Sequence, residues 1–251
     1  MRVAAIYDIH GNLPALEAVL EDIYNEAVDC IVVGGDVVAG PLPSETLALL
    51  QSVTSPTYFI HGNAEAELLR YLAGEAPGGL SERADDEARW VAQVLSPEEK
   101  QFVASWSATV TLDIDGWGDV LFCHATPNSN ITVFTAMTPE EKLLPLFSEL
   151  TASLVVCGHT HMPFDRTIGG VRVINAGSVG MPFGRTGADW LFIDTDLDFR
   201  HLDYNATAAA ERIRQSAYPQ AEDFAAHNVL QAPSKEDAMK MLAWVESKQA
   251  K

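Results

Sequence analysis

Seven side chains that commonly bind metal ions stand where short apolar runs of the sequence stop. Any one of them alone has an ordinary interpretation, because aspartate before glycine is common in turns and histidine often follows a strand as a half-buried, hydrogen-bonded residue. They form five clusters, and the loops at the carboxyl ends of parallel strands lie together. We therefore expect one shared site. Its residues are Asp8, His10, Asp36, Asn63, His124, His159 and His161.

The donor types predict which ions would bind. Imidazole and carboxylate ligands without thiolate favour Mn²⁺, Fe²⁺, Co²⁺, Ni²⁺ or Zn²⁺ over a structural zinc site. Seven ligands exceed what one such ion accepts beside an open position, so two ions with a shared carboxylate are expected. Two ions roughly 3.5–4 Å apart can hold a bridging water, lower its pKa and stabilise an in-line displacement at phosphorus. The predicted cofactor is therefore a pair of divalent transition-metal ions. The ligand types leave Mn²⁺, Fe²⁺, Zn²⁺, Ni²⁺ and Co²⁺ open, and we take Mn²⁺ as the first candidate.

The elements that position these residues alternate between strand and helix at the start of the chain. Apolar runs at residues 3–7, 30–33 and 57–60 predict strands, and the segments that begin at Pro14 and at Leu42 predict helices. This alternation is typical of a largely parallel, buried sheet. The segment from about 65 to 106 is expected to be a helical insertion.

The second half predicts short strands followed by a helical tail. Apolar runs at 109–114, 120–123, 154–157, 171–174 and 190–194 are separated by glycine-rich turns, which is typical of antiparallel hairpins. Helical patterning returns after Tyr204, and Ser234 is a candidate N-cap for the last helix. We expect one domain over residues 1–204 and a helical extension over 205–251 that packs on it.

Composition and charge exclude several classes of protein. The chain has 251 residues, 47% of them hydrophobic and 20% charged, which excludes a disordered or collagen-like protein. No apolar run of 18 residues occurs and no signal peptide is evident, so we expect no membrane association and a cytoplasmic location. The net charge of −19 disfavours long nucleic acid as a partner. Three cysteines without CxxC spacing are expected to be buried, reduced thiols.

Six short motifs follow the predicted strands in a fixed order. They are D-I-H-G-N at 8–12, G-G-D at 34–36, G-N at 62–63, C-H at 123–124, G-H-T-H at 158–161 and N-A-G-S-V-G at 175–180. These motifs resemble those of the calcineurin-like metallophosphoesterases, especially the small bacterial and archaeal phosphodiesterase branch. The resemblance covers about residues 1 to 200 and implies an α/β (α+β) fold, a four-layer αββα sandwich of two mixed β-sheets flanked by helices, with a dinuclear centre at the strand tops.

The same resemblance implies a division of the ligands between two ions. Asp36 would bridge both. One ion would be held by Asp8, His10, Asp36 and His161, and the other by Asp36, Asn63, His124 and His159.

The third motif departs from the family pattern. Many members have G-N-H-D or G-N-H-E there, with a histidine that helps to protonate the leaving group, whereas this chain has Ala64. Loss of a positioned acid lowers the rate by about 10²–10⁴ where the leaving group needs a proton. His61 is a candidate replacement acid, and the alternative is a histidine that points to the opposite face of the strand. We otherwise expect a leaving group that needs little help or is protonated through water.

Two further residues are candidate substrate ligands. Asn12 lies in the first motif, where it could contact a phosphate oxygen or cap the helix that Pro14 opens. Arg185 could bind phosphate as a guanidinium clamp or be an ordinary surface arginine.

The function predicted from these residues and the resemblance is hydrolysis of phosphodiester bonds by attack of a metal-bridging hydroxide on phosphorus. Asn63 and the two ions would stabilise the developing charge. One alternative is a phosphomonoesterase or protein phosphatase of the same fold, and the other is a partner-binding scaffold without turnover. The expected partner is a small phosphodiester or phosphomonoester, and the oligomeric state is left open.

Overall fold

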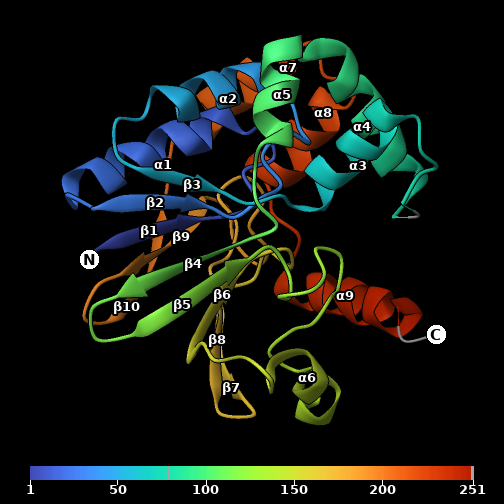
Figure 1. Cartoon of the computed structure of the whole chain (residues 1–251). Helices are drawn as coiled ribbons and strands as arrows, with labels where there is room; N and C mark the ends of the chain where they lie inside the picture. The colour runs from blue at the N-terminus through green and yellow to red at the C-terminus, as the bar shows by residue number, and fades with distance from the viewer. Residues whose placement is uncertain (79, 250–251) are drawn as a thin grey trace.

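Two five-stranded sheets pack face to face in the computed structural model, which describes residues 1–78 and 80–249 (Figure 1). The first sheet has the order β10-β9-β1-β2-β3, formed by β1 (Val3–Ile6), β2 (Cys30–Val33), β3 (Thr57–Phe59), β9 (Ala188–Ile193) and β10 (Leu197–Leu202). The second has the order β4-β5-β6-β8-β7, formed by β4 (Thr109–Ile114), β5 (Gly118–Cys123), β6 (Leu154–Cys157), β7 (Phe164–Ile168) and β8 (Val171–Asn175).

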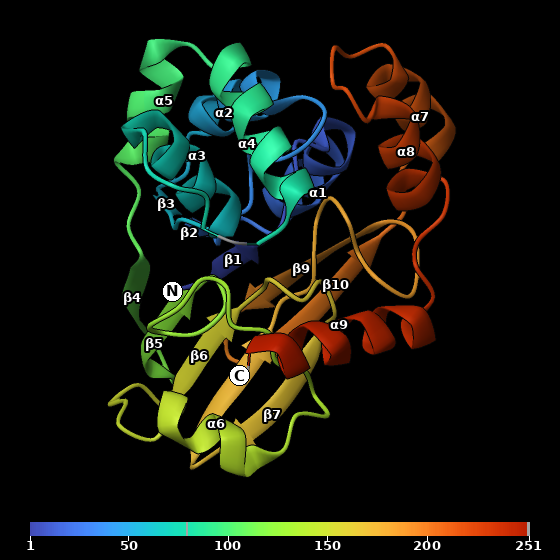
Figure 2. The same cartoon turned by 90° about the vertical axis from the view of Figure 1, so that its right-hand side faces the viewer.

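Helices cover the outer face of each sheet, which confirms the predicted four-layer αββα sandwich (Figure 1). The second sheet is covered by α6 (Glu140–Phe147). Most other helices lie on the side of the first sheet: α1 (Leu13–Asn25), α2 (Pro43–Ser52), α3 (Asn63–Ala73), α4 (Glu82–Val94), α5 (Pro97–Ala104), α7 (Ala206–Arg214), α8 (Ala221–Phe224) and the π-helix η1 (Ala225–Val229). The last helix, α9 (Lys235–Gln249), lies beside the second sheet (Figure 2).

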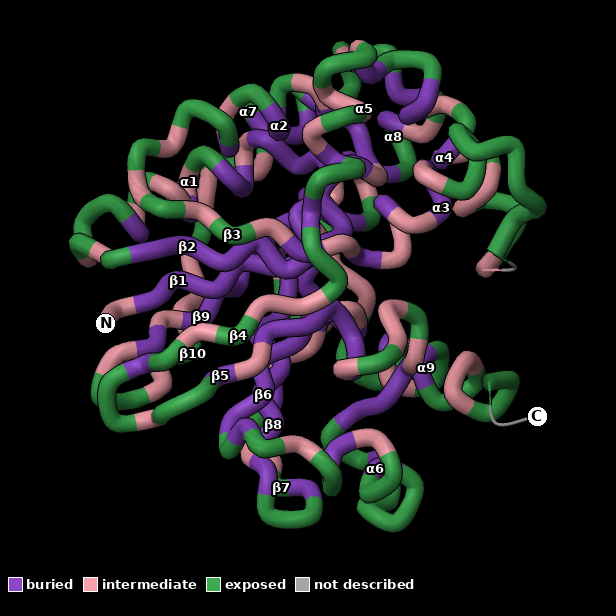
Figure 3. Tube along the Cα trace, viewed as in Figure 1, coloured by how far each residue is buried: buried purple, intermediate pink, exposed green. Residues whose placement is uncertain are grey.

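The strand β1 is buried on both faces because it lies between the helices and the second sheet (Figure 3). Ala4 and Ile6 pack in the core under the helices, whereas Val3 and Ala5 pack between the two sheets. Successive side chains of a strand point to opposite faces, so an unbroken apolar run is required here. Because β1 is packed on both faces, its carboxyl end lies at the centre of the molecule.

The strand directions correct one prediction about the second half. The pairs β4–β5 and β7–β8 are antiparallel hairpins as expected, but β5–β6 and β6–β8 are parallel. A crossover that contains α6 separates β5 from β6, which lets both strands run the same way. The prediction missed α6, whose interior contains Pro145, and the strands β7 and β10. Both strands lie at sheet edges, where β7 buries only its end residues and β10 buries none, so their apolar runs are short.

Two local predictions are confirmed. Ser234 caps α9 by accepting a hydrogen bond from the Asp237 N–H. Cys30, Cys123 and Cys157 are buried free thiols. Within the described residues, no helix is both long and apolar enough to cross a bilayer.

The predicted extension packs against the rest of the chain through α9. The Gln249 side chain accepts a hydrogen bond from the Val133 N–H at 2.8 Å, and Glu246 accepts one from the Thr138 hydroxyl at 3.0 Å. The domain boundary at 204/205 itself stays a prediction. Residue 79 of the insertion and residues 250–251 of the extension lie outside the described residues.

Candidate metal centre

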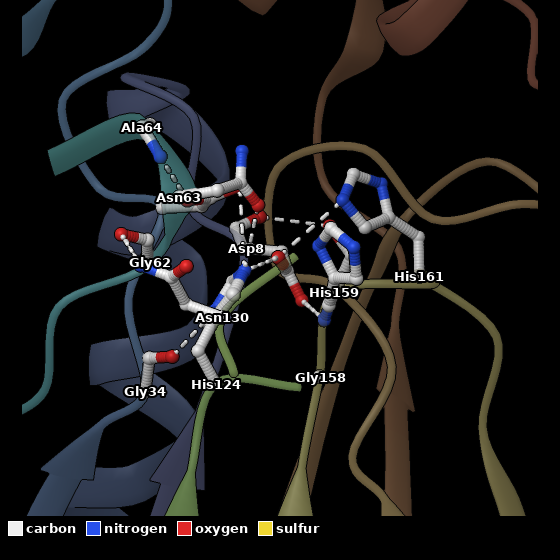
Figure 4. Close-up of polar contacts among 12 residues, drawn as sticks. Asp8, Gly34, Gly62, Asn63, Ala64, His124, Asn130, Gly158, His159 and His161 are labelled. Atoms are coloured by element: carbon white, nitrogen blue, oxygen red, sulfur yellow. Dashed lines mark hydrogen bonds and ion pairs between the residues drawn. The ribbon is translucent and has the colours of Figure 1, made fainter. Parts of the chain in front are cut away.

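Each of the seven predicted ligands follows a strand, and the strand ends bring them together. Asp8 and His10 follow β1, Asp36 follows β2, and Asn63 begins α3 just beyond β3. From the second sheet, His124 follows β5, while His159 and His161 follow β6 (Figure 4). Because β1, β2, β3, β5 and β6 end in the same region, side chains distant in sequence face one another.

The backbone at these positions is unusual for residues with a side chain. Five of the ligands have positive φ: Asp8 53°, His10 50°, Asp36 51°, His159 67° and His161 56°. Among the described non-glycine residues, Ala27 is the one further example. Each such residue costs on the order of 1–3 kcal/mol and persists where the surroundings impose it, commonly at functional sites. The strained conformations therefore coincide with the predicted ligands rather than with ordinary turns.

The donor atoms form two adjoining groups. In the first group, comprising Asp8, His10 and His161, one donor atom from each residue lies within 4.8 Å of the others. The second group meets the same criterion with Asp36, His124 and His159. Asp36 connects the two, because its Oδ2 lies 3.6 Å from His124 Nε2 and 3.8 Å from His10 Nε2.

Asn63 lies on the second group's side of the cluster. Its side-chain amide is 3.1 Å from His124 Nε2. The structure thus brings all seven predicted ligands into one site.

Backbone carbonyls fix which nitrogen three of the histidines present. The Nδ1 atoms of His10, His124 and His161 lie 3.0, 2.8 and 2.9 Å from the carbonyl oxygens of Ala39, Gly34 and Met181. A proton on each Nδ1 satisfies these carbonyls and leaves a lone pair on Nε2, the usual arrangement of metal-ligating histidines. His10 Nε2 and His161 Nε2 are 3.2 Å apart, so these two lone pairs converge on one point.

Among the described residues, seven buried side-chain polar atoms lack a hydrogen-bond partner, and two of the seven lie in the predicted centre. Asp8 Oδ1 and His159 Nε2 have no hydrogen bond, although leaving such an atom buried costs about 1–3 kcal/mol. Both belong to residues of the two donor groups. Unpartnered acceptors amid converging imidazole lone pairs are what a pair of divalent transition-metal ions would satisfy, and the residues present therefore fit that cofactor.

The pKa values of Asp36, His124 and His159 also suit the binding of metal ions. Burial opposes ionisation of Asp36, yet His124 and His10 hold the pKa of that carboxyl well below its usual range. Burial likewise opposes the charge on His124, but the facing Asp36 carboxylate raises its pKa to about 10. Burial lowers the pKa of His159 to about 4. The site thus contains ionised carboxylates and a neutral imidazole, and an incoming ion would displace a proton from His124.

The segment N-A-G-S-V-G at residues 175–180 forms hydrogen bonds to the loops that carry Asp8 and His159. Ser178 Oγ donates to the Asp8 carbonyl at 2.7 Å, and the Gly180 N–H donates to the same carbonyl at 2.9 Å. Asn175 Nδ2 donates to the Gly158 carbonyl and to the Thr160 hydroxyl, which holds the loop that carries His159. The residues of this motif therefore hold the loops that carry the predicted ligands in position.

Glu65 is a site residue that the sequence analysis missed. It is fully buried, and its carboxylate accepts hydrogen bonds from the N–H groups of Gly62, Asp36 and Val37 at 2.8 Å each and from that of Val38 at 3.2 Å. It therefore holds the Asp36 loop against the start of α3. The sequence does contain a sign of this role: Glu65 comes three residues after Gly62, the N-cap of α3. A glutamate at that position commonly accepts a hydrogen bond from the N-cap N–H.

The structure gives the remaining predicted residues protein partners. Asn12 is buried and caps α1: its Oδ1 accepts from the Ala15 N–H, and its Nδ2 donates to the Gly180 carbonyl and the Tyr204 hydroxyl. Arg185 is half exposed and forms an ion pair with Asp189 at 2.7 Å. A contact of either side chain with phosphate stays a prediction.

His61 lies near the second donor group, but its side chain already forms a hydrogen bond within the protein. Its Nε2 is 2.7 Å from the Val103 carbonyl, and its ring stacks on Trp106. It also lines a cleft together with His124. Its role as an acid stays a prediction.

Three cavities border the centre. A small one of about 70 Å³ is lined by His10, Asp36, Asn63 and Ala64 together with residues of α3 and α4. A cleft of about 480 Å³ borders His124 and is lined by His61 and residues 126–130. A cleft of about 510 Å³ borders His10 and is lined by α4 and the C-terminal extension. The two larger clefts thus adjoin different donor groups.

Comparison with known proteins gives consistent matches. A model of the calcineurin-like phosphoesterase superfamily domain matches residues 1–198. The chain is 28% identical to the uncharacterized protein MJ0912 of Methanocaldococcus jannaschii over 244 residues, which covers 87% of this chain and 94% of that protein. It is also 28% identical to the phosphodiesterase YfcE of Escherichia coli over 200 residues, or 78% and 89% of the two chains.

A solved structure shows the same fold. The crystal structure of a metallophosphoesterase from Sphaerobacter thermophilus matches with a TM-score of 0.71 at 23% identity, covering 91% of this chain and 99% of that chain. The sandwich and its order of elements are therefore shared with a protein of low sequence identity.

Proposed function

Because the chain belongs to the calcineurin-like phosphoesterase superfamily, we propose that it hydrolyses small phosphodiesters with the help of two divalent transition-metal ions, Mn²⁺ foremost. The observation that carries the proposal is the cluster of six converging donor residues joined by Asp36. A named relative, the phosphodiesterase YfcE, supports the choice of a diester. So do the two clefts, because a diester has two substituents and each cleft adjoins a different donor group.

The residues of the site have separable tasks. His10 and His161, oriented by the carbonyls of Ala39 and Met181, would hold one ion with Asp8, while His124, His159 and Asn63 would hold the other. Asp36 would bridge them. When bound, the ions supply positive charge for the phosphate and lower the pKa of an attacking water. The clefts orient the two substituents, and the net charge of −19 disfavours long polyanions.

The test compares bis(p-nitrophenyl) phosphate with p-nitrophenyl phosphate in Mn²⁺, with an EDTA control. We expect a higher initial rate for the diester and loss of both activities in EDTA, since the ligands would be left without ions. A preference for the monoester would favour a phosphomonoesterase or protein phosphatase. If protein that is shown to contain metal hydrolyses neither substrate, the result would favour a partner-binding scaffold without turnover.

The alanine at position 64 gives a second prediction. Ala64 donates its N–H to Asp36 Oδ1 at 2.8 Å and lines the small cavity with His10 and Asp36. Ala64→His should place an acid there and accelerate hydrolysis of adenosine 2′,3′-cyclic phosphate, an alkoxide-leaving diester, by about tenfold or more. Hydrolysis of bis(p-nitrophenyl) phosphate should change little, because nitrophenolate leaves without a proton.

Ala64→Gln serves as the control, since it adds bulk without an acid. Equal effects of histidine and glutamine, or no gain on the cyclic substrate, would contradict the idea that this position lacks a useful acid.

A further inference from the structure

The cleft beside His10 is built largely by parts of the chain outside the ligand motifs. Its walls come from α4, from the loop at 181–183, from α8 and η1, and from α9. Figure 2 shows α8 above α9 on the right-hand side of the view. The C-terminal extension therefore lines this side of the centre.

Aromatic and methionine side chains form much of the apolar wall, which also includes alanine and proline residues. Phe183 is half-buried, and its ring centroid lies 4.9 Å from that of the ligand His161, so the wall begins directly at the centre. Tyr218 and Phe224 line the same cleft from the extension, and Met241 lines it from α9. Flat rings bind well between aromatic faces, and methionine adapts to their outline.

The charged groups of the cleft already have ion-pair or hydrogen-bond partners. Arg83 forms an ion pair with Asp223 at 3.1 Å, and His227 Nδ1 lies 3.0 Å from the same residue. Glu87 accepts a hydrogen bond from the Tyr218 hydroxyl, and Asp237 accepts one from the Ser234 hydroxyl. No unpaired cation lines the cleft among the described residues. A second anionic group on the substrate would therefore be disfavoured here.

We propose that this cleft binds one substituent of the phosphodiester and selects an uncharged ring system, of which a nucleoside is an example. The proposal rests on the proposed function and adds the class of substituent. A volume of about 510 Å³ suits a group of this size. His10 is common to the cleft and the first donor group, so a phosphate held at the centre would direct a substituent into it.

The test uses two diesters with the same leaving group, thymidine 5′-(p-nitrophenyl phosphate) and methyl p-nitrophenyl phosphate. Both esters carry the p-nitrophenyl ring as the leaving group, and only the thymidine ester has a ring system as its second substituent. We expect kcat/KM to be higher for the thymidine ester by about tenfold, because that second substituent can occupy the cleft. Met241→Glu should reduce this ratio by about the same factor, since it adds charge to the wall at an exposed position of α9 (47% exposed). Met137→Glu, at a position 76% exposed outside the cleft, should leave the ratio unchanged.

A binding measurement separates this proposal from the proposed function. By calorimetry of the metal-loaded protein, thymidine 5′-monophosphate should bind more tightly than methyl phosphate, and Met241→Glu should remove the difference. Failure to hydrolyse either ester would overturn the proposed function but not the subsite. Equal kcat/KM for both esters with equal binding of the two phosphates, or equal effects of the two methionine variants, would overturn the subsite.

Discussion

Asp36→Asn is expected to lower kcat/KM for bis(p-nitrophenyl) phosphate by about 10³-fold or more while the fold stays intact. Asp36 Oδ2 lies within 3.8 Å of histidines from both donor groups, so this carboxylate is the natural bridge between two ions. Bound ions contribute several kcal/mol of charge stabilisation, and each 1.36 kcal/mol corresponds to tenfold in rate. The amide keeps the shape of the side chain but removes the charge that the ions require.

The measurements are steady-state kinetics, metal content after dialysis and the unfolding temperature without added metal. Asp119→Asn is the matched control, because it makes the same chemical change at an exposed position of β5 remote from the ligands. Full activity in Asp36→Asn would contradict the assigned centre. Loss of activity together with a large fall in the unfolding temperature would instead show that Asp36 is needed for the stability of the fold.

The cluster of candidate ligands could be predicted from the sequence because its residues stand where apolar runs end. A buried strand such as β1 must be apolar on both faces, so Asp8 marks its end clearly. The convergence of separate strand ends was an expectation from sheet geometry, and the structure meets it with Asp36 between the two groups. What the pattern did not indicate is the positive φ that lets Asp8, His10 and His161 face the same point.

The clefts and the edge strands could not be predicted in this way. The wall beside His10 combines Phe183, Tyr218 and Met241 from three distant segments, and no local pattern relates them. The strand β7 buries only its two end residues, and no residue of β10 is buried, so charged residues interrupt the apolar signal in both strands. Local patterns identify residues whose neighbours in sequence determine their role, and they miss contacts made across the fold.

Glu65→Gln tests the strongest of these missed contacts and is expected to destabilise the protein by about 3–5 kcal/mol. The buried carboxylate serves four backbone N–H groups, whereas an amide would turn its own N–H₂ toward some of them. For a chain of this size the unfolding temperature should fall by about 10 °C. Metal content should fall as well, because the Asp36 loop loses its anchor.

Glu99→Gln is the matched control for this variant. Glu99 is the third residue of α5 and accepts a hydrogen bond from the Ser96 N–H at 2.7 Å, as Glu65 does from Gly62 in α3, but it is half-buried and holds no ligand loop. The cost common to both variants is that of a helix cap, about 1 kcal/mol. Only the excess in Glu65→Gln measures how firmly the Asp36 loop is held, and that excess should be accompanied by weaker metal retention. Equal effects of the two variants on stability and metal content would show that Glu65 merely caps α3.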